Sequence, residues 1–213
     1  MTKITQEQNM ISDKQLGMNV ESIDLMFGRT KGFMTTSLEL IASQFERGQF
    51  VRQLVYNSVD ANCTNINVSY EHDDQTNLTN IVFEDDGDGI TLSEERHFLT
   101  TVGSSKYQGD TSKIGEFGIG FISVFAENPT QVQVETTSKE GSYALLIDSP
   151  KTSIGGKIIY SDKPNDATGT VVTMQIEETR AEYEQRENLI LSELKMCSGQ
   201  VKPEIHYQEK EVQ

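Results

Sequence analysis

The chain has 213 residues and a formal net charge of −15, because 33 acidic side chains outnumber 18 basic ones. Hydrophobic residues make up 35% of the sequence, as in a globular domain, and no apolar stretch approaches the roughly 20 residues that span a bilayer, so we expect a cytoplasmic protein without membrane contacts. The acidic balance argues against a general nucleic-acid surface, which needs clustered Lys and Arg, but permits an anionic ligand held locally by backbone N–H groups.

The first part of the chain divides into a polar segment and a helix. Residues 1–35 are polar and irregular, and we interpret them as an N-terminal arm that docks on the body or on a second copy. A helical pattern then runs from residue 38 to about 61. Its spacing predicts one buried face: Val51, Leu54, Val55, Ser58 and Val59. A polar set shares another face and either converges on a ligand or faces water: Gln49, Gln53, Asn57 and Asp60.

A hairpin is predicted next. Apolar and polar residues alternate at 66–70, a polar turn follows at 72–77, and residues 78–83 predict a second, antiparallel strand. This strand runs into a sharp glycine-rich turn at 84–90. Residues 91–98 begin with a pattern that resembles a capping box and predict a short helix.

The following segments predict a loop, a buried helix and then mostly strands. Residues 103–113 are small and polar and predict a loop or lid. The sequence IGEFGIGF at 114–121 leads into an apolar run that predicts a buried helix. Four strands are expected after it: 131–137, 142–147, 157–160 and 170–176. A second amphipathic helix covers about 182–196 and offers four side chains to the core: Tyr183, Ile190, Leu191 and Leu194.

The order of these elements predicts an α+β fold, a two-layer sandwich with helices on one face of a mixed, mainly antiparallel sheet. We divide the sequence into the arm at 1–35, a central domain at 36–200, and a following segment at 201–213. That last segment resembles a strand, a turn and the start of a partner strand. We therefore interpret the chain as a fragment of a longer protein, with a solvated tail as the alternative.

The glycines of IGEFGIGF predict an anion site. Gly115, Gly118 and Gly120 allow positive φ and a close approach of backbone to a ligand, directly before a helix whose N-terminus presents unpaired N–H groups. Phosphate groups commonly fill such cradles. A tight turn packed on the core would give a similar pattern. The Walker spacing is absent and no βαβ unit surrounds the segment, so neither a P-loop nor a Rossmann fold explains it.

The turn at 85–89 has the form DxGxG. Asp85 at the end of a strand can accept hydrogen bonds from an exocyclic amine, and the glycines let a flat ring lie against the backbone. A calcium loop is the rival interpretation of the three acidic residues, but no Glu stands at the distance that an EF-hand requires. Cys63 and Cys197 form no CxxC, which disfavours a zinc site, and we expect both to be reduced and partly buried.

Each of these motifs is ambiguous alone, but their order is specific. RQLVYNSVDA at 52–61, DxGxG at 85–89, IGEFGIGF at 114–121 and a Gly-Thr pair opening a strand at 169–170 together resemble the GHKL superfamily of ATPases, which includes gyrase, heat-shock-protein-90 chaperones, histidine kinases and MutL. The first and third motifs look closest to the chaperone branch. GSSK at 103–106 resembles the lid of MutL-like members.

The resemblance implies a Bergerat-type ATP-binding fold, with ATP and Mg²⁺ as ligands. Asn57 would coordinate Mg²⁺. Two neighbouring residues would lie beside the nucleotide: Asp60 and Ala61. Asp85 would accept from the adenine amino group. Three further residues would line or hold the base: Gly89, Ile90 and Thr170.

The resemblance also assigns the phosphate end of the site. Four residues would give backbone N–H groups to the phosphates: Gly118, Ile119, Gly120 and Phe121. The lid would contribute four more residues: Val102, Gly103, Ser105 and Lys106. Of these, Lys106 would reach the phosphates once the lid closes.

The chain departs from the hydrolysing branches at one position. Four residues before the magnesium Asn, where those branches carry a Glu as general base, this sequence has Gln53. A neutral amide cannot take a proton, although it can orient water. Three explanations are open: an engineered substitution that traps ATP, a natural binder that switches on nucleotide occupancy, or a weak water-positioning residue in a slow ATPase.

The resemblance implies a chaperone- or MutL-like ATPase domain whose lid closure and nucleotide-dependent homodimerisation drive a conformational cycle. Its partners would be ATP and ADP, a protein client or further domains of the same chain, and no nucleic acid directly. A histidine-kinase-type phosphotransferase is the first alternative, but no preceding two-helix module with a phospho-accepting His is present, and we expect each His to be an ordinary surface residue: His72, His97 and His206. A non-hydrolysing nucleotide-binding scaffold is the second.

Overall fold

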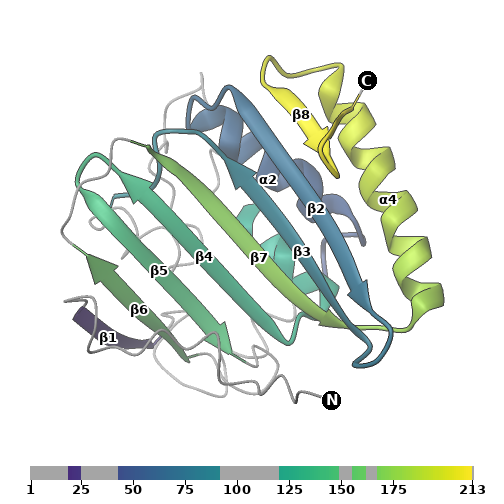
Figure 1. The fold of residues 1–213 in the computed structure, drawn as a ribbon, viewed down its shortest axis with the longest axis horizontal. Coiled ribbons are helices and arrows are strands. Elements are labelled where there is room, and N and C mark those ends of the chain that lie inside the picture. The colour runs from purple at the N-terminus through teal and green to yellow at the C-terminus, as the bar shows by residue number, and fades with distance from the viewer. Residues whose placement is uncertain (1–18, 25–42, 92–119, 149–154, 162–166, 213) are drawn as a thin grey trace, which may run out of the picture.

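The computed structural model describes residues 19–24, 43–91, 120–148, 155–161 and 167–212. These residues form a nine-stranded sheet with the spatial order β1-β6-β5-β4-β7-β3-β2-β8-β9 (Figure 1). In chain order the strands are β1 (Asn19–Asp24), β2 (Asn65–Asp73), β3 (Leu78–Asp85), β4 (Gln131–Ser138), β5 (Gly141–Asp148), β6 (Gly155–Ser161), β7 (Gly169–Glu177), β8 (Glu204–Tyr207) and β9 (Lys210–Glu211). Every neighbouring pair is antiparallel except β2 and β8, which are parallel, so the sheet is mixed and mainly antiparallel.

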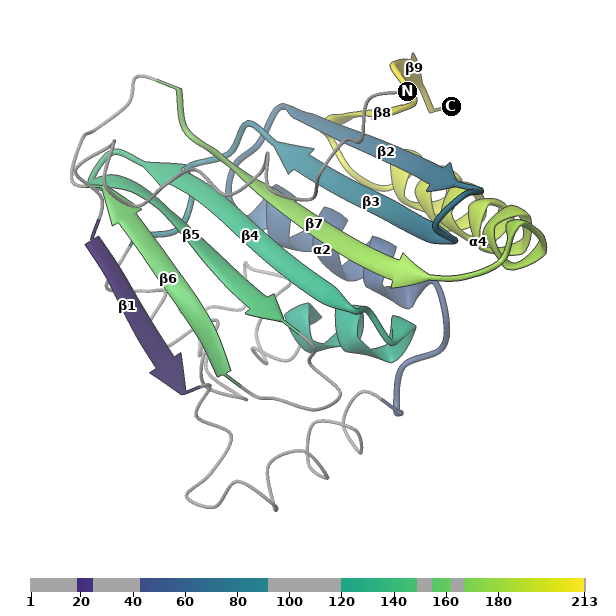
Figure 2. The same cartoon turned by 60° about the horizontal axis from the view of Figure 1, so that its bottom comes forward.

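Three described helices form the second layer: α2 (Gln49–Asp60), the 3₁₀ helix η1 (Gly120–Glu127) and α4 (Arg180–Ser198). Figure 2 shows α2 and η1 side by side against one face of the sheet, with α4 along the β2 side. The predicted α+β sandwich, with helices on one face of a mixed sheet, is confirmed.

The core lies between these layers, and strand alternation explains its composition. Residues at every second position point toward the helices, and they are apolar in the middle of the sheet. Ile81 and Phe83 of β3 and Val132 and Val134 of β4 are buried in this way. They meet an apolar face of α2: Phe50, Val51, Leu54 and Val55. Each such side chain contributes about 1.5–3 kcal/mol by leaving water.

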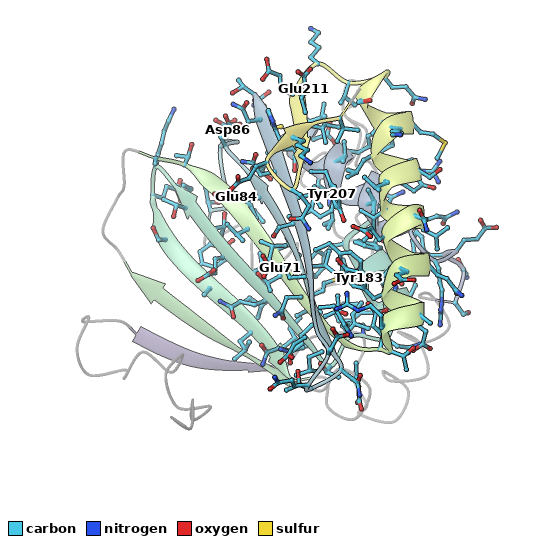
Figure 3. All side chains as sticks on the ribbon, turned by 45° about the vertical axis from the view of Figure 1, so that its right-hand side comes forward. Glu71, Glu84, Asp86, Tyr183, Tyr207 and Glu211 are labelled. Atoms are coloured by element: carbon cyan, nitrogen blue, oxygen red, sulfur yellow. The ribbon has the colours of Figure 1, made fainter. Side chains whose placement is uncertain are left out.

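Helix α4 is fixed to β2 and β8 by aromatic residues. The rings of Tyr183 and Tyr70 stack with centroids 4.4 Å apart. The hydroxyl of Tyr207 donates to Glu187 Oε1 of α4 over 2.9 Å. In Figure 3, Tyr183 and Tyr207 lie between α4 and the neighbouring strands. The helix begins at a capping box formed by Thr179 and Glu182, a motif that the sequence analysis did not assign.

A buried charge cluster joins α4 to the start of α2 and the end of η1. Arg186 contacts both Glu127 and Glu178, and its Nε lies 2.7 Å from Glu178 Oε2. The backbone N–H of Gly48 donates to Glu127 Oε1 over 2.7 Å, and the hydroxyl of Tyr70 donates to Glu178 Oε1 over 2.7 Å. The cluster therefore joins the start of α2 and the end of η1 to Arg186 of α4.

Most predicted elements are present, including both strands of the hairpin, the four later strands, and the C-terminal strand and turn. The helix predicted from residue 38 instead begins at Gln49, because 43–48 contain turns and Gly48 has φ +85°. Residues 38–42 and the predicted elements at 91–98 and 103–113 lie outside the described residues, apart from Thr91. The helix after the glycines is 3₁₀, and β1 was not predicted.

The prediction of surface histidines is wrong for His72, whose side chain has no exposed area. Its Nδ1 lies 2.8 Å from Thr79 Oγ1, and its ring packs on Tyr183 at 5.3 Å. His206 is half-buried, and His97 lies outside the described residues. Since the hairpin and α4 cover His72 from both sides, its burial is a tertiary effect.

Candidate functional site

A row of polar residues crosses three neighbouring strands where the apolar core ends. Asp85 of β3 pairs with Thr170 of β7, and Thr170 pairs with Thr136 of β4. Strand alternation places all three on the helix-facing side of the sheet. The next row inward is apolar and consists of Phe83, Val172 and Val134. The sheet thus changes abruptly from a dry core to a band of hydrogen-bonding groups.

Asp85 is the centre of this row. Its Oδ2 accepts a hydrogen bond from the Ser58 hydroxyl of α2 over 2.8 Å, and its Oδ1 accepts from the backbone N–H of Gly87 over 3.0 Å. Burial raises the pKa of Asp85, although these bonds and one from the backbone of Thr170 oppose the shift. A carboxylate in such surroundings is a strong acceptor for a ligand N–H group.

Thr136 organises the other end of the row and was not predicted. Its hydroxyl oxygen accepts from the Ile90 backbone N–H over 2.9 Å and lies 3.1 Å from Thr170 Oγ1. The same hydroxyl lies 3.2 Å from the Gly169 carbonyl oxygen, to which it can donate. The sequence offered one signal of this role. Thr136 occupies a core-facing position of β4, and the two preceding core-facing residues of that strand are Val132 and Val134.

Two glycines let the segments around the row pack backbone to backbone. A Cβ on Gly169, whose φ is +152°, would stand 2.2 Å from the carbonyl oxygen of Asp85. A Cβ on Gly89, with φ +70°, would stand 2.1 Å from the carbonyl oxygen of Thr137. No side chain fits in either place. These glycines of the two motifs therefore hold the strand ends around Asp85.

The other acidic residues of the turn at 85–89 tie the turn to the connection between α2 and β2. The carboxylate of Asp86 accepts four hydrogen bonds from the backbone and side chains of Thr64 and Asn65, at 2.6–2.8 Å. Although burial opposes it, these bonds hold the pKa of Asp86 well below its usual range. Asp88 accepts from Asn62 Nδ2 over 2.6 Å. Both carboxylates thus have structural partners, which explains them without a calcium ion.

The polar face of α2 borders the same region. Gln53 and Asn57 are half-buried, and Asp60 is buried. A Cβ on Gly120 would stand 2.8 Å from Gln53 Oε1, so the Gln53 side chain lies against the start of η1. Phe121 is buried and packs edge-to-face on Phe125, which leaves its backbone, not its ring, for a ligand.

The predicted site residues that the structure describes fall into three groups. Gln53, Asn57, Asp60 and Ala61 lie on or directly after α2, and the base-lining residues lie around the strand ends: Asp85, Gly89, Ile90 and Thr170. Gly120 and Phe121 start η1. The remaining predicted residues lie outside the described residues: Val102, Gly103, Ser105, Lys106, Gly118 and Ile119.

The cysteines supply no nucleophile to this region. Cys63 and Cys197 are both free, as predicted, and they are buried where partial burial was expected. Burial, together with the smaller effect of the charges of Asp85 and Asp86, raises the pKa of Cys63 to about 12. Burial likewise raises the pKa of Cys197 to about 11. Thiols with such pKa values are unreactive at neutral pH.

The described donor set fits a purine nucleotide with a metal ion. Asp85 and Thr170 offer acceptors beside each other at one end of α2, and Asn57 offers an amide oxygen one turn away from Gln53. Mg²⁺ uses few protein ligands and takes the remainder from phosphates and water, so a single Asn suffices. Within the described residues there is no cluster of three or more His, Cys, Asp or Glu side chains that could hold a metal by itself.

Comparison with known proteins is consistent with the α+β fold. The family model described as "Histidine kinase-, DNA gyrase B-, and HSP90-like ATPase" matches residues 48–182. DNA mismatch repair protein MutL of Bacillus cytotoxicus is 27% identical over 130 residues, which cover 59% of this chain and 18% of that protein. MutL of Bacillus anthracis is also 27% identical over 130 residues, covering 59% and 19%. The match thus spans about a fifth of these relatives.

No described helix is long and apolar enough to cross a membrane.

Proposed function

The chain belongs to the histidine kinase-, DNA gyrase B- and HSP90-like ATPase family, and on that premise we propose that it binds Mg²⁺ and ATP between α2 and the ends of β3, β7 and β4. The observation that carries the proposal is the half-buried Asp85 carboxylate, held by Ser58 and Gly87 in a row with Thr170. Its oxygens can accept a hydrogen bond from the exocyclic amine of an amino-purine.

At the adenine end, Asp85 accepts from the exocyclic amine, and Gly89 and Ile90 line the ring. Thr170 supplies a second polar group next to Asp85, because the two residues are direct partners in the sheet. Asp60 and Ala61, at the end of α2, lie beside the nucleotide. The burial of Asp60 supports this placement, since an aspartate on a plain solvated helix face would be exposed.

At the phosphate end, Asn57 holds Mg²⁺ and the glycine segment surrounds the phosphates. The contact between Gln53 and Gly120 supports this arrangement, because it brings the polar face of α2 against the end of that segment. We assign backbone contacts to Gly118, Ile119, Gly120 and Phe121. We assign lid contacts to Val102, Gly103, Ser105 and Lys106.

Position 53 determines whether bound ATP is hydrolysed. The carboxamide of Gln53 can hold a water molecule but cannot accept its proton, so hydrolysis in this chain is slow or absent. ATP then acts mainly by occupancy, closing the lid and favouring a dimer of the domain. The matched relatives, named DNA mismatch repair protein MutL, favour a MutL-like conformational cycle over a chaperone-like one.

Calorimetric titration of the chain with Mg²⁺ and ATP tests this function. Asp85→Asn should weaken ATP about 10- to 100-fold, because an amide presents a donor where the adenine amine also donates. Asp74→Asn is the control, since Asp74 lies on the surface in an ion pair with Arg180. Absence of ATP binding by the unmodified chain, or equal affinity in Asp85→Asn, would overturn the proposal.

A further inference from the structure

We propose that Thr136 determines the base specificity of the site, by fixing the Thr170 hydroxyl as an acceptor so that a 6-aminopurine is bound and a 6-oxopurine is rejected. This inference rests on the proposed nucleotide site and adds to it a residue that no motif contains. Thr136 is buried on β4, two strands away from Asp85, and it contacts two residues assigned to the base, Thr170 and the backbone of Ile90.

The neighbours of Thr136 leave one arrangement of protons that satisfies every group. A threonine hydroxyl has one proton and two lone pairs. The Ile90 N–H, 2.9 Å away, can only donate, so it takes one lone pair of Thr136. The Gly169 carbonyl oxygen, 3.2 Å away, can only accept, so it takes the proton of Thr136. The second lone pair of Thr136 then faces the Thr170 hydroxyl.

Thr170 must therefore donate to Thr136 across the 3.1 Å that separates their oxygens. Once this proton is engaged, Thr170 has only lone pairs left for a ligand. Asp85, its partner in the sheet, likewise accepts from Ser58 and Gly87 and offers acceptors alone. The strand ends thus present two acceptors and no hydroxyl donor to the base.

An acceptor pair distinguishes purines at the 6-position. The 6-amino group of adenine donates, so it is satisfied by Asp85 and Thr170 directly or through a shared water molecule. The 6-oxo group of hypoxanthine or guanine accepts, and it would face two acceptors without a proton between them. Buried polar groups that lack a partner are strongly disfavoured, which makes this a mechanism of rejection as well as of binding.

The opposite proton arrangement would have the opposite specificity. If Thr136 donated to Thr170, the Gly169 carbonyl oxygen would lose its hydroxyl partner and the Thr170 proton would be free to point at the ligand. A 6-oxo group could then accept from it. Thr136→Val creates this freedom, because valine has the shape of threonine but neither a lone pair nor a proton to offer.

The test compares the affinities of Mg²⁺-ATP and Mg²⁺-ITP, which differ in the purine at C6, by calorimetry on the full chain. The unmodified chain should prefer ATP. Thr136→Val should lower the ATP:ITP affinity ratio at least about 10-fold, mainly by strengthening ITP. Thr136→Ser retains the hydroxyl and should retain the ratio. Thr137→Val is the matched control, because that hydroxyl bonds Ser142 instead of Thr170.

Each outcome decides the inference. An unchanged ratio in Thr136→Val, or equal weakening of both nucleotides, would show that Thr136 only supports the fold. If Thr136→Val does not fold, Thr170→Val takes its place, and an unchanged ratio in that variant overturns the inference equally. Absence of ATP binding by the unmodified chain would overturn the proposed function as well, whereas tight ATP binding with an unaltered ratio overturns this inference alone.

Discussion

The side-chain amide of Gln53 lies against the backbone of Gly120, so closely that a Cβ at residue 120 would stand 2.8 Å from Gln53 Oε1. Gln53 lies on the second turn of α2, and Gly120 is the first residue of η1. The contact fits a nucleotide site in which residue 53 acts on the phosphates, since it places that residue at the end of the glycine segment.

Gln53→Glu should therefore produce or raise ATP hydrolysis. The change is nearly isosteric and introduces a carboxylate that can accept a proton from water, a role worth about 10²–10⁴-fold in rate. Phosphate release under saturating Mg²⁺ and ATP measures it. Gln49→Glu is the control, because it adds the same charge to the same helix one turn earlier. Equal rates in the two variants would contradict the role of position 53.

Gly169→Ala should destabilise the chain by at least about 2 kcal/mol. The added Cβ would stand 2.2 Å from the carbonyl oxygen of Asp85, and a clash with backbone cannot be relieved by a side-chain rotation. Gly199→Ala is the control: Gly199 has φ −77° and no atom within 4 Å of its Cβ position. It should be neutral or stabilise by about 0.4–1 kcal/mol. Urea denaturation measures both, and similar losses would refute the close approach.

Arg186→Met should cost about 3–5 kcal/mol, because it leaves the buried carboxylates of Glu127 and Glu178 without their cation. Arg180→Met removes an exposed ion pair with Asp74 and should cost less than about 1 kcal/mol. Thermal and urea unfolding of the two variants test the contrast. A small loss in Arg186→Met would mean that the cluster contributes little to the attachment of α4.

The sequence was sufficient for elements whose pattern is local. Alternation at 66–70 and 78–83 predicts the β2–β3 hairpin because each residue's burial depends on its position in one strand. The motif around Asp85 was also readable, since a carboxylate and glycines at the end of a strand suggest a ligand wherever the remaining chain lies. These patterns were sufficient to predict the hairpin, the body of α2 and the glycine-rich turn that follows β3.

Features that depend on distant partners were missed. Strand β1 pairs with β6, more than 130 positions later in the chain, and its own pattern is weak. Arg186 resembles a surface residue of an amphipathic helix, but Glu127 and Glu178 from two other segments neutralise it in the core. Thr136 acquires its role only because Ile90, Gly169 and Thr170 converge on it. Tertiary context, not local pattern, determines all three.

The raised pKa of Asp85 predicts opposite pH dependences for binding and stability. ATP requires the ionised carboxylate as acceptor, so affinity should fall as the pH is lowered through the folded-state pKa, which lies above the ordinary 3.8. In the free chain, burial penalises the ionised form. The protonated carboxyl carries no such penalty. The contribution of Asp85 to the free energy of unfolding is therefore fully present below its unfolded-state pKa and is lost as the pH rises through its folded-state pKa.

Asp85→Asn removes that penalty, so the variant should be more stable than the unmodified chain at pH 7 while it binds ATP more weakly. The amide can still accept from Gly87 and donate to Ser58, whose hydroxyl then donates to the Leu54 carbonyl oxygen at 3.1 Å. The stability difference should shrink as the pH falls toward the ordinary carboxyl range, because protonation neutralises Asp85 as well. Urea denaturation at a series of pH values measures the difference. A variant less stable at pH 7, or a difference that grows on acidification, would mean that hydrogen bonds outweigh burial at this carboxylate.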